Sequence, residues 1–228
     1  MHNAKKNVNI RAVYSILKRE FAKYRVPVVD LIEMQTDDPF KVLVTTILSA
    51  RTKDETTTQA SRRLFAKVKK LSDFVKISKH DIEKLIFPVG FYRTKAKHLK
   101  ELPGAIKTLF SGAIPDSVDE LIKLPGVGRK TANLVVAVAF HKPAVCVDVH
   151  VHRICNRLGY VKTKTPFETE MKLREVLPVE LWMMFNSYLV SFGQHLCYPV
   201  NPRCDICPVA RYCNRVGVVT KFSLKSFS

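Results

Sequence analysis

Hydrophobic residues recur along most of the chain at the three- and four-residue intervals of amphipathic helices. Between Arg11 and Tyr24, for example, Val13, Ile16 and Leu17 fall on one face of a helix. No segment alternates between hydrophobic and polar residues over a useful strand length, so the pattern predicts an all-α fold. The predicted helices span residues 11–24, 37–48, 54–68, 81–87, 94–110, 118–124, 131–140, 148–158, 167–176 and 180–194.

Proline and small polar residues mark several of the expected helix ends. Pro39 suits the first turn of a helix, where its missing N–H is not needed. Ser78 and Ser117 each precede a hydrophobic run, and Glu120 follows Ser117 at the interval of a capping box. Pro103 falls inside a long predicted helix, which we expect it to interrupt or kink. These residues support the helix limits drawn from the periodicity.

The composition bounds the class of protein. Its 228 residues allow one large domain or two small ones, and 46% hydrophobic residues can build a sizeable core. Lysine and arginine total 38, and aspartate and glutamate total 20, which gives a net charge of +18. Such a surplus predicts a polyanionic partner, either nucleic acid or an anionic membrane surface. A basic protein without such a partner is the plain alternative.

The sequence argues against a membrane partner. The apolar run at 134–140 is far shorter than the roughly 20 residues that span a bilayer, and we expect the helix 131–140 to be buried on all sides. The N-terminal segment has no apolar stretch after its lysines, so no secretory signal is predicted. We therefore expect an intracellular protein of the cytoplasm or nucleoid, where disulfide bonds are rare.

Four of the six cysteines lie within residues 197–213, with the spacing C-x6-C-x2-C-x5-C. Thiolates gathered in one short loop suit a metal ion or an iron–sulfur cluster. Structural zinc sites usually use two close pairs, whereas only Cys204 and Cys207 form one here, so the spacing favours a four-iron cluster without excluding zinc. Cys146 and Cys155 lie in apolar segments and are expected in the core. The four candidate ligands are Cys197, Cys204, Cys207 and Cys213.

A glycine-rich segment at 124–132 is expected to join two helices. Gly126 and Gly128 permit a tight turn and remove side chains that would block a close approach. The following helix then presents free backbone N–H groups and the positive end of its dipole, which suits a phosphate. Arg129 and Lys130 add positive charge, so we favour a DNA-backbone clamp that reads no sequence over an ordinary turn.

Three motifs in order carry a family resemblance: LPGVGRKTAN at 124–133, VDVHVHR at 147–153 and the cysteine loop at 197–213. Together they resemble the endonuclease III family of helix-hairpin-helix DNA glycosylases, which have a Gly/Pro-rich loop and a following aspartate. The resemblance covers about residues 10–214 and implies a [4Fe–4S] cluster on the four cysteines. It also implies a bifunctional enzyme that removes oxidised pyrimidines of the thymine glycol type from duplex DNA and cleaves the abasic site by β-elimination.

The resemblance further implies two helical domains with a DNA-binding cleft between them. A helical barrel domain with the helix-hairpin-helix is expected at residues 32–142. A second domain, which combines residues 1–31 with residues 143–228, is expected to hold the cluster loop. The implied partner is double-stranded DNA that contains damaged pyrimidines or abasic sites, and the protein is expected to act as a monomer.

Two residues match the catalytic positions of that family. Lys130 matches the catalytic lysine, whose neutral amine can attack the sugar C1′ and form a Schiff base. Asp148 matches the catalytic aspartate, since a carboxylate stabilises a sugar with oxocarbenium character. From the residues alone, Lys130 is as readily a phosphate-binding lysine, and Asp148 is a natural helix N-cap.

Other positions correspond to DNA contacts of the family. Phe91 stands at the intercalating-loop position, where an aliphatic residue is usual, although core packing is the alternative. Arg51 replaces the usual glutamine, and we expect it to favour a guanine opposite the lesion, because arginine can form a bidentate pair with a guanine edge. Asp54 matches an acidic position near the lesion pocket, yet it can also cap a helix.

Further phosphate contacts are expected from the hairpin and from the second domain. His150 and Arg203 are both candidates, although a histidine in the core is the alternative for His150. The implied DNA contacts are therefore Gly126, Gly128, Arg129, Arg51, Phe91, His150 and Arg203.

Two other functions compete with this interpretation. A mismatch-specific glycosylase of the same superfamily usually lacks a lysine at position 130. A catalytically idle DNA-binding module would keep the hairpin, the charge and the cysteines without needing both Lys130 and Asp148. A magnesium-dependent nuclease is less favoured, since no cluster of aspartate and glutamate indicates a magnesium site.

Overall fold

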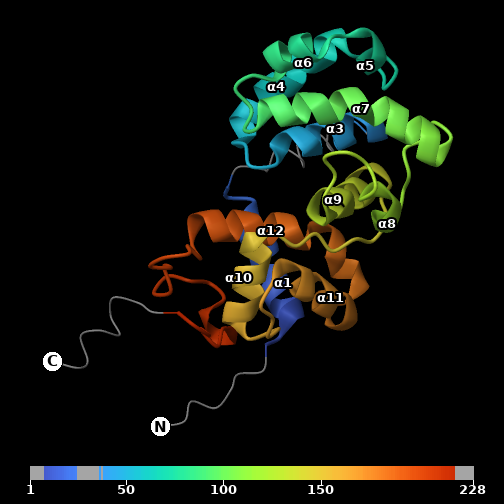
Figure 1. Ribbon diagram of the computed structural model, residues 1–228. Helices are drawn as coiled ribbons and strands as arrows, with labels where there is room; N and C mark the ends of the chain where they lie inside the picture. Colours follow the sequence, from blue (N-terminus) through green and yellow to red (C-terminus); the bar gives the residue numbers. More distant parts are fainter. Residues whose placement is uncertain (1–7, 25–35, 37, 219–228) are drawn as a thin grey trace. The chain divides into compact units, whose positions relative to one another are not determined.

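The computed structural model describes residues 8–24, 36 and 38–218. Every regular element within these ranges is helical, which confirms the predicted all-α class (Figure 1). The short helix α5 (Asp73–Lys76) and the 3-10 turn η2 (Ala210–Tyr212) were not predicted, because a single turn carries no periodicity. Asp37, at the expected start of one helix, lies outside the described residues.

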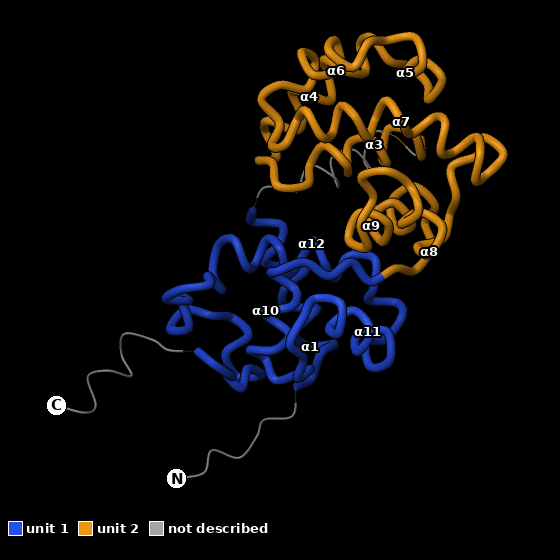
Figure 2. Tube along the Cα trace, viewed as in Figure 1, with its two compact units in different colours: residues 1–26, 145–228 blue, residues 27–144 orange. Residues whose placement is uncertain are grey.

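The chain divides into two compact units, shown in Figure 2. One unit is Pro27–Ala144, and the other combines Met1–Val26 with Val145–Ser228. The sequence analysis placed the limits of the domain that corresponds to Pro27–Ala144 at residues 32 and 142. The Pro27–Ala144 unit, orange in Figure 2, contains α3 (Pro39–Ser49), α4 (Asp54–Lys67), α5, α6 (Lys79–Ile86), α7 (Tyr92–Phe110), α8 (Val118–Leu121) and α9 (Arg129–Ala139).

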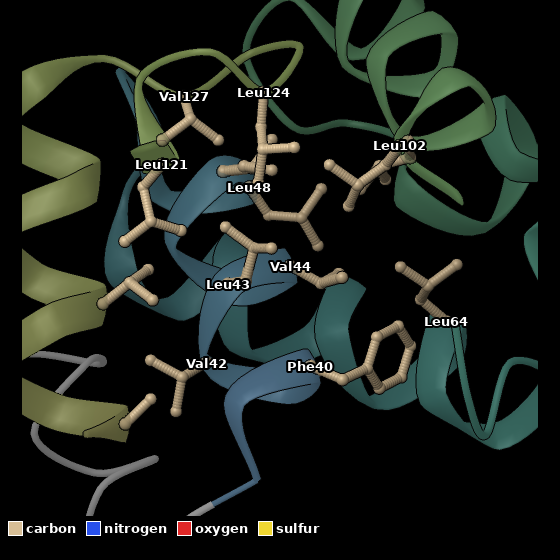
Figure 3. Close-up of a cluster of buried hydrophobic side chains, with 14 of the residues drawn as sticks. Phe40, Val42, Leu43, Val44, Leu48, Leu64, Leu102, Leu121, Leu124 and Val127 are labelled. Atoms are coloured by element: carbon tan, nitrogen blue, oxygen red, sulfur yellow. The ribbon is translucent and has the colours of Figure 1, made fainter. Parts of the chain in front are cut away.

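The core of the Pro27–Ala144 unit is built around α3. Eight of the eleven residues of this helix are buried, namely Phe40 and the seven residues from Val42 to Leu48, and the helix packs against α9, α4 and α7. Figure 3 shows hydrophobic side chains gathered about it, with Phe40 and Leu64 on one side and Leu121, Leu124 and Val127 on another. Because Leu124 and Val127 are held in this core, the hairpin between α8 and α9 has a fixed base.

Capping residues begin several of these helices. The Asp38 carboxylate accepts a hydrogen bond from Phe40 N at 3.0 Å, and Ser78 Oγ accepts one from Asp81 N at 3.0 Å. Ser117 is the N-cap of α8, as predicted, but its hydroxyl donates to Glu120 Oε2 at 2.7 Å and caps no backbone N–H. The structure thus keeps the residue pair of the predicted capping box with a different hydrogen bond.

Two helices differ from their predicted continuity or limits. Pro103 does not interrupt its helix, because α7 runs continuously through it and the proline is buried. Helix α9 begins at Arg129 rather than Thr131, so Arg129 and Lys130 belong to its first turn. Its side chains from Thr131 to Ala139 are nearly all buried, as expected from their apolar character.

The other unit, blue in Figure 2, is centred on α12 (Trp182–His195), which packs against α1 (Ile10–Phe21) and α10 (Val149–Leu158). Tyr188 of α12 contacts the rings of Tyr14 and Phe21 at centroid distances of 5.1 and 5.0 Å. Cys155 is fully buried in this core, as expected. The remaining elements are α11 (Pro166–Val176), η1 (Val179–Leu181) and η2.

None of the helices in the described ranges is both long enough and apolar enough to cross a membrane.

Candidate functional site

The hairpin between α8 and α9 contains two glycines in different conformations. Val127 N donates to Leu124 O at 3.2 Å, which closes the turn. Gly126 lies in the left-handed region at φ +78°, and a Cβ there would stand 2.7 Å from His98 Nδ1. Gly128 is extended, at φ −92° and ψ 172°, and a Cβ there would meet no atom within 4 Å. The fold therefore requires glycine at position 126, whereas at position 128 it leaves open space.

Gly128 is also the N-cap of α9, where it provides no side-chain hydrogen bond to the first turn. Arg129 and Lys130 follow in that turn, and the Lys130 side chain is exposed. Arg129 Nη1 lies 3.7 Å from Asp119 Oδ1 of α8, so this exposed ion pair joins the two helices of the hairpin. Positive side chains and the positive helix end thus lie together beside the open space at Gly128.

Asp54 lies close enough to Lys130 for their charges to interact, although the two residues are far apart in the sequence. Partial burial raises the pKa of Asp54 above its usual value, and the positive charge of Lys130 opposes that rise. Asp54 is the first residue of α4, whose N-cap is Lys53, so the alternative of a helix cap is wrong. The Pro27–Ala144 unit thereby places a carboxylate with a raised pKa beside the predicted nucleophile.

Asp148 is the N-cap of α10. Its Oδ1 accepts hydrogen bonds from His150 N at 2.9 Å and from Val151 N at 3.0 Å. These two bonds fix the orientation of the carboxylate at a positive helix end. The capping role expected from the sequence is present, and it is compatible with a second role for the same carboxyl group.

His150 takes part in a network with Arg153 on the next turn of α10. His150 Nδ1 lies 3.1 Å from Arg153 Nη2, and a Cβ on Gly193 of α12 would stand 2.5 Å from the same ring nitrogen. Arg153 also donates to Cys197 O at 2.9 Å. The half-buried imidazole therefore packs against α12, and Arg153 ties α10 to the start of the cysteine loop.

The four clustered cysteines line one cavity, together with apolar side chains and the side chains of Arg157 and Arg203. In the described ranges, no three Cys, His, Asp or Glu side chains gather closely enough to hold a single metal ion. Four thiol groups that line one cavity within a single short loop can provide the ligands of a metal ion or of an iron–sulfur cluster.

The environment of these thiols requires a compensating positive charge. Burial, together with the charges of the other three thiols, raises the pKa of Cys207 to about 11. Burial and the neighbouring thiols also raise the pKa of Cys213. Iron ions within the cavity would supply that charge and hold the sulfurs as thiolates, so the residues fit an iron–sulfur cluster.

Arg157 organises the cysteine loop, although the sequence analysis did not single it out. Its Nη1 donates to Tyr198 O at 2.6 Å and lies 3.5 Å from Cys197 Sγ, while its Nη2 donates to Pro199 O at 2.7 Å. The sequence feature that could have identified Arg157 is its position one turn after Arg153 on α10. Arg203, which was predicted to contact phosphate, is exposed on this loop, and its N donates to Leu196 O at 3.0 Å.

Arg51 and Phe91 come together in the Pro27–Ala144 unit. The Arg51 guanidinium lies over the Phe91 ring, 5.6 Å from its centroid. The Phe91 side chain is 62% exposed, which excludes the alternative of core packing. Both residues have left-handed backbone, at φ 55° and 56°. Two predicted DNA contacts from different loops therefore form one exposed pair.

Comparisons with known proteins agree with these features. The HhH-GPD superfamily of base excision DNA repair proteins matches residues 44–179, and the iron–sulfur binding domain of endonuclease III matches residues 197–213. Endonuclease III of Thermotoga maritima is 48% identical over 176 residues, which are 77% of this chain and 83% of that protein.

Two solved structures resemble the chain over 90% of its length and 94% of theirs. A non-covalent endonuclease III–DNA complex gives a TM-score of 0.79 at 33% identity. A trapped endonuclease III–DNA covalent intermediate, an estranged-adenine complex, gives 0.78 at 32% identity. The cysteine loop thus belongs to an iron–sulfur domain, and the hairpin belongs to a DNA repair fold. The chain is a member of the endonuclease III family, the DNA glycosylases and abasic-site lyases of base excision repair.

Proposed function

We propose that this enzyme removes oxidised pyrimidines of the thymine glycol type from duplex DNA and cleaves the abasic site by β-elimination through a Schiff base on Lys130. The observation that carries the proposal is the exposed Lys130 in the first turn of α9, beside Asp54 and the open space at Gly128. The trapped covalent DNA intermediate of the similar endonuclease III structure supports the same kind of chemistry.

The reaction requires a neutral amine at Lys130. An unperturbed lysine has a pKa of about 10.4, so only about 1 in 2,500 molecules is neutral at pH 7. Asp54 is placed to accept the Lys130 proton, and its raised pKa makes it a better proton acceptor than an ordinary aspartate. The amine then attacks C1′, and the base leaves with its bonding electrons and a proton.

Elimination follows from the covalent adduct. Opening of the sugar ring gives an imine between Lys130 Nζ and C1′, which makes the C2′ proton acidic. Loss of that proton expels the 3′ phosphate and breaks the strand, and water then releases the lysine. Asp148, fixed by its two backbone hydrogen bonds, stabilises the positive charge that develops on the sugar.

DNA is held through its backbone and opened at the lesion. The hairpin binds phosphate at Gly128 and Arg129, while Gly126 shapes the turn. The exposed Phe91 ring enters the base stack at the position of the extruded nucleotide, which offsets part of the unstacking cost. Arg51 contacts the base opposite the lesion and favours guanine.

The cluster is of the [4Fe–4S] type, bound by Cys197, Cys204, Cys207 and Cys213. The cavity that these sulfurs line and their mutual charge repulsion support this assignment. Held by these cysteines, a cluster would order the loop that presents Arg203 to phosphate, and His150 orients Arg153 at the base of that loop.

Borohydride trapping tests the proposed chemistry. Wild type, Lys130→Ala and Lys130→Arg are incubated with duplexes that contain thymine glycol or an abasic site. The exposed Lys123 of the same hairpin gives a matched control, Lys123→Ala. We expect covalent complexes on both duplexes with wild type and Lys123→Ala, and none with either variant at position 130.

Other outcomes would change the assignment. Trapping on the abasic site alone would leave a lyase that acts on a different base. Trapping by Lys130→Ala would identify another amine as the nucleophile. Retained DNA affinity without any trapping would favour a monofunctional glycosylase or an idle DNA-binding module. Equal cleavage rates opposite all four bases would refute the role of Arg51.

A further inference from the structure

Lys95 is a buried lysine of α7 whose ammonium group makes three hydrogen bonds. Only 6% of the residue is exposed. Its Nζ donates to Leu48 O at 2.8 Å, to Ala50 O at 2.6 Å and to Thr52 Oγ1 at 3.2 Å. An ammonium group has three N–H donors, so these acceptors satisfy all of them.

The three acceptors lie where α3 ends and the turn that carries Arg51 begins. The last carbonyls of a helix have no partner within the helix, and a cation at that end is favourable. Lys95 binds one carbonyl before the turn, one carbonyl at the C-cap Ala50 and one hydroxyl after it. The left-handed backbone of Arg51, which is rare for a residue with a side chain, is thus held from both sides.

Thr52 links this turn to the loop that carries Phe91. Its Oγ1 accepts a hydrogen bond from Gly90 N at 3.1 Å and donates to Ala50 O at 3.3 Å. A Cβ on Gly90 would stand only 2.5 Å from Arg51 O, so the two loops are in direct backbone contact. The backbone N of Lys95 donates in turn to Phe91 O at 3.0 Å.

Burying the Lys95 ammonium group costs desolvation free energy, and filling this space by packing alone would not need a charged residue. Burial lowers the pKa of Lys95 to about 8. Within the described ranges no carboxylate offsets the desolvation of Lys95, whose ammonium group is compensated by its three hydrogen bonds. An apolar residue of similar volume would fill the same space without that cost.

We propose that Lys95 is a positioning residue that locks the Arg51 turn to the Phe91 turn, so that the two side chains enter DNA as one rigid pair. This inference rests on the proposed DNA contacts of Arg51 and Phe91. Lys95 touches no reacting atom. Its effect is to preorganise two strained loops before DNA is bound.

A double-mutant cycle measures this coupling. Affinity for a duplex with a stable abasic-site analogue is measured for Arg51→Ala, Phe91→Ala and the double variant, in the wild-type background and again with Lys95→Met. With Lys95 present, we expect the two substitutions to be non-additive by about 5-fold or more, as for residues in direct contact. With Lys95→Met, we expect them to become additive.

Lys100 provides a matched control on the same helix. Its Nζ donates to three carbonyls, Phe74 O at 3.0 Å, Val75 O at 2.9 Å and Ile77 O at 2.7 Å, which do not belong to either loop. Lys100→Met removes a similar lysine cap, and the coupling between Arg51 and Phe91 should survive it. Thr52→Val and Thr52→Ser test the link if Lys95→Met does not fold: valine should abolish the coupling and serine should keep it.

The possible results separate this inference from the proposed function. Coupling that persists in both Lys95→Met and Thr52→Val would overturn the positioning role while leaving the DNA contacts in place. Coupling that is lost equally in Lys100→Met would also overturn it, because general destabilisation would then be the cause. If neither Arg51→Ala nor Phe91→Ala weakens binding, the proposed contacts fail, and the positioning role fails with them.

Discussion

Replacing either glycine of the hairpin by alanine should have a different effect, on folding at position 126 and on DNA binding at position 128. Gly126→Ala puts a methyl group into left-handed backbone and against His98, whose Nδ1, Cβ and Cγ would lie at 2.7, 3.1 and 3.1 Å. Gly128→Ala puts a methyl group into extended backbone with no protein atom within 4 Å. The first change should therefore affect folding, and the second should affect the approach of DNA.

The magnitudes follow from these surroundings. At position 126 the left-handed conformation costs about 1–2 kcal/mol for a residue with a Cβ. The contact with His98 adds roughly 1–3 kcal/mol, because the Cβ and Cγ of a histidine cannot move aside as a flexible chain end can. Alanine also restricts the unfolded chain, and this effect raises the free energy of unfolding by about 0.4–1 kcal/mol. We expect Gly126→Ala to lower the free energy of unfolding by about 1–5 kcal/mol.

At position 128 the two stability effects nearly cancel. Alanine is a poorer N-cap than glycine, which destabilises the fold. It also lowers the entropy of the unfolded chain, which stabilises the fold by about 0.4–1 kcal/mol. We expect the free energy of unfolding to change by less than about 0.5 kcal/mol. If a phosphate hydrogen-bonds to the backbone there, losing that bond costs about 1.5–3 kcal/mol, so DNA affinity should fall roughly 10- to 100-fold.

Urea unfolding and fluorescence anisotropy at one fixed salt concentration measure the two effects. Gly112→Ala serves as a control, because Gly112 also has a left-handed backbone, at φ +90°, but a Cβ there would meet nothing within 4 Å. Its loss of stability isolates the backbone strain from the contact with His98. Wild-type DNA affinity in Gly128→Ala would refute phosphate binding at the hairpin, and wild-type stability in Gly126→Ala would refute the steric argument.

Three further predictions concern other parts of the molecule. Cys207→Ser should abolish the visible absorption of the cluster and lower the unfolding temperature by roughly 5–10 °C, the effect of about 2–3 kcal/mol in a chain of this size; normal absorption would show that Cys207 binds no iron. Asp54→Asn should slow borohydride trapping about 100-fold with little change in DNA affinity, and an unchanged rate would place the proton acceptor elsewhere. Burial lowers the pKa of Lys95 to about 8 in the folded protein, below its ordinary 10.5. The unfolded chain therefore binds more protons between pH 8 and 10.5, and this group adds to the free energy of unfolding as the pH rises through that range. The groups that face Lys95 Nζ are two carbonyls and a hydroxyl, which do not titrate there. Relative to Lys95→Met, the wild type should gain stability across the range, and a constant difference in urea unfolding would contradict the burial argument.

Much of the fold was predictable because its causes are local. Helical periodicity and capping depend on residues within a few positions of one another, so α1, α3, α4 and α10 were found to within a few residues of their limits. The continuity of α7 at Pro103 was not predictable, because it depends on tertiary packing. A proline in isolation weakens a helix, but the burial of Pro103 within α7 outweighs the lost hydrogen bond.

The candidate site was predictable where one short segment carries all of its members. The four cysteines fall within one loop, and the hairpin carries Gly126, Gly128 and Lys130 within a few residues. Their spacing alone indicates metal binding and phosphate binding, and the order of the motifs indicates the family. By itself, therefore, the sequence determined the helical class and the cofactor loop, whereas the reactive role of Lys130 follows from the family resemblance and stays a prediction.

Only the tertiary structure decided which residues from distant segments lie together. Asp54 lies beside Lys130, Arg51 lies over Phe91, and Lys95 binds the turn that carries Arg51. Nothing in the periodicity distinguishes Lys95 from an exposed lysine, because its burial depends on where α3 ends against α7. Likewise, the two glycines look alike in the sequence, and only the position of His98 makes one essential for folding and leaves the other open. Contacts of this kind depend on packing between elements, which local patterns do not specify.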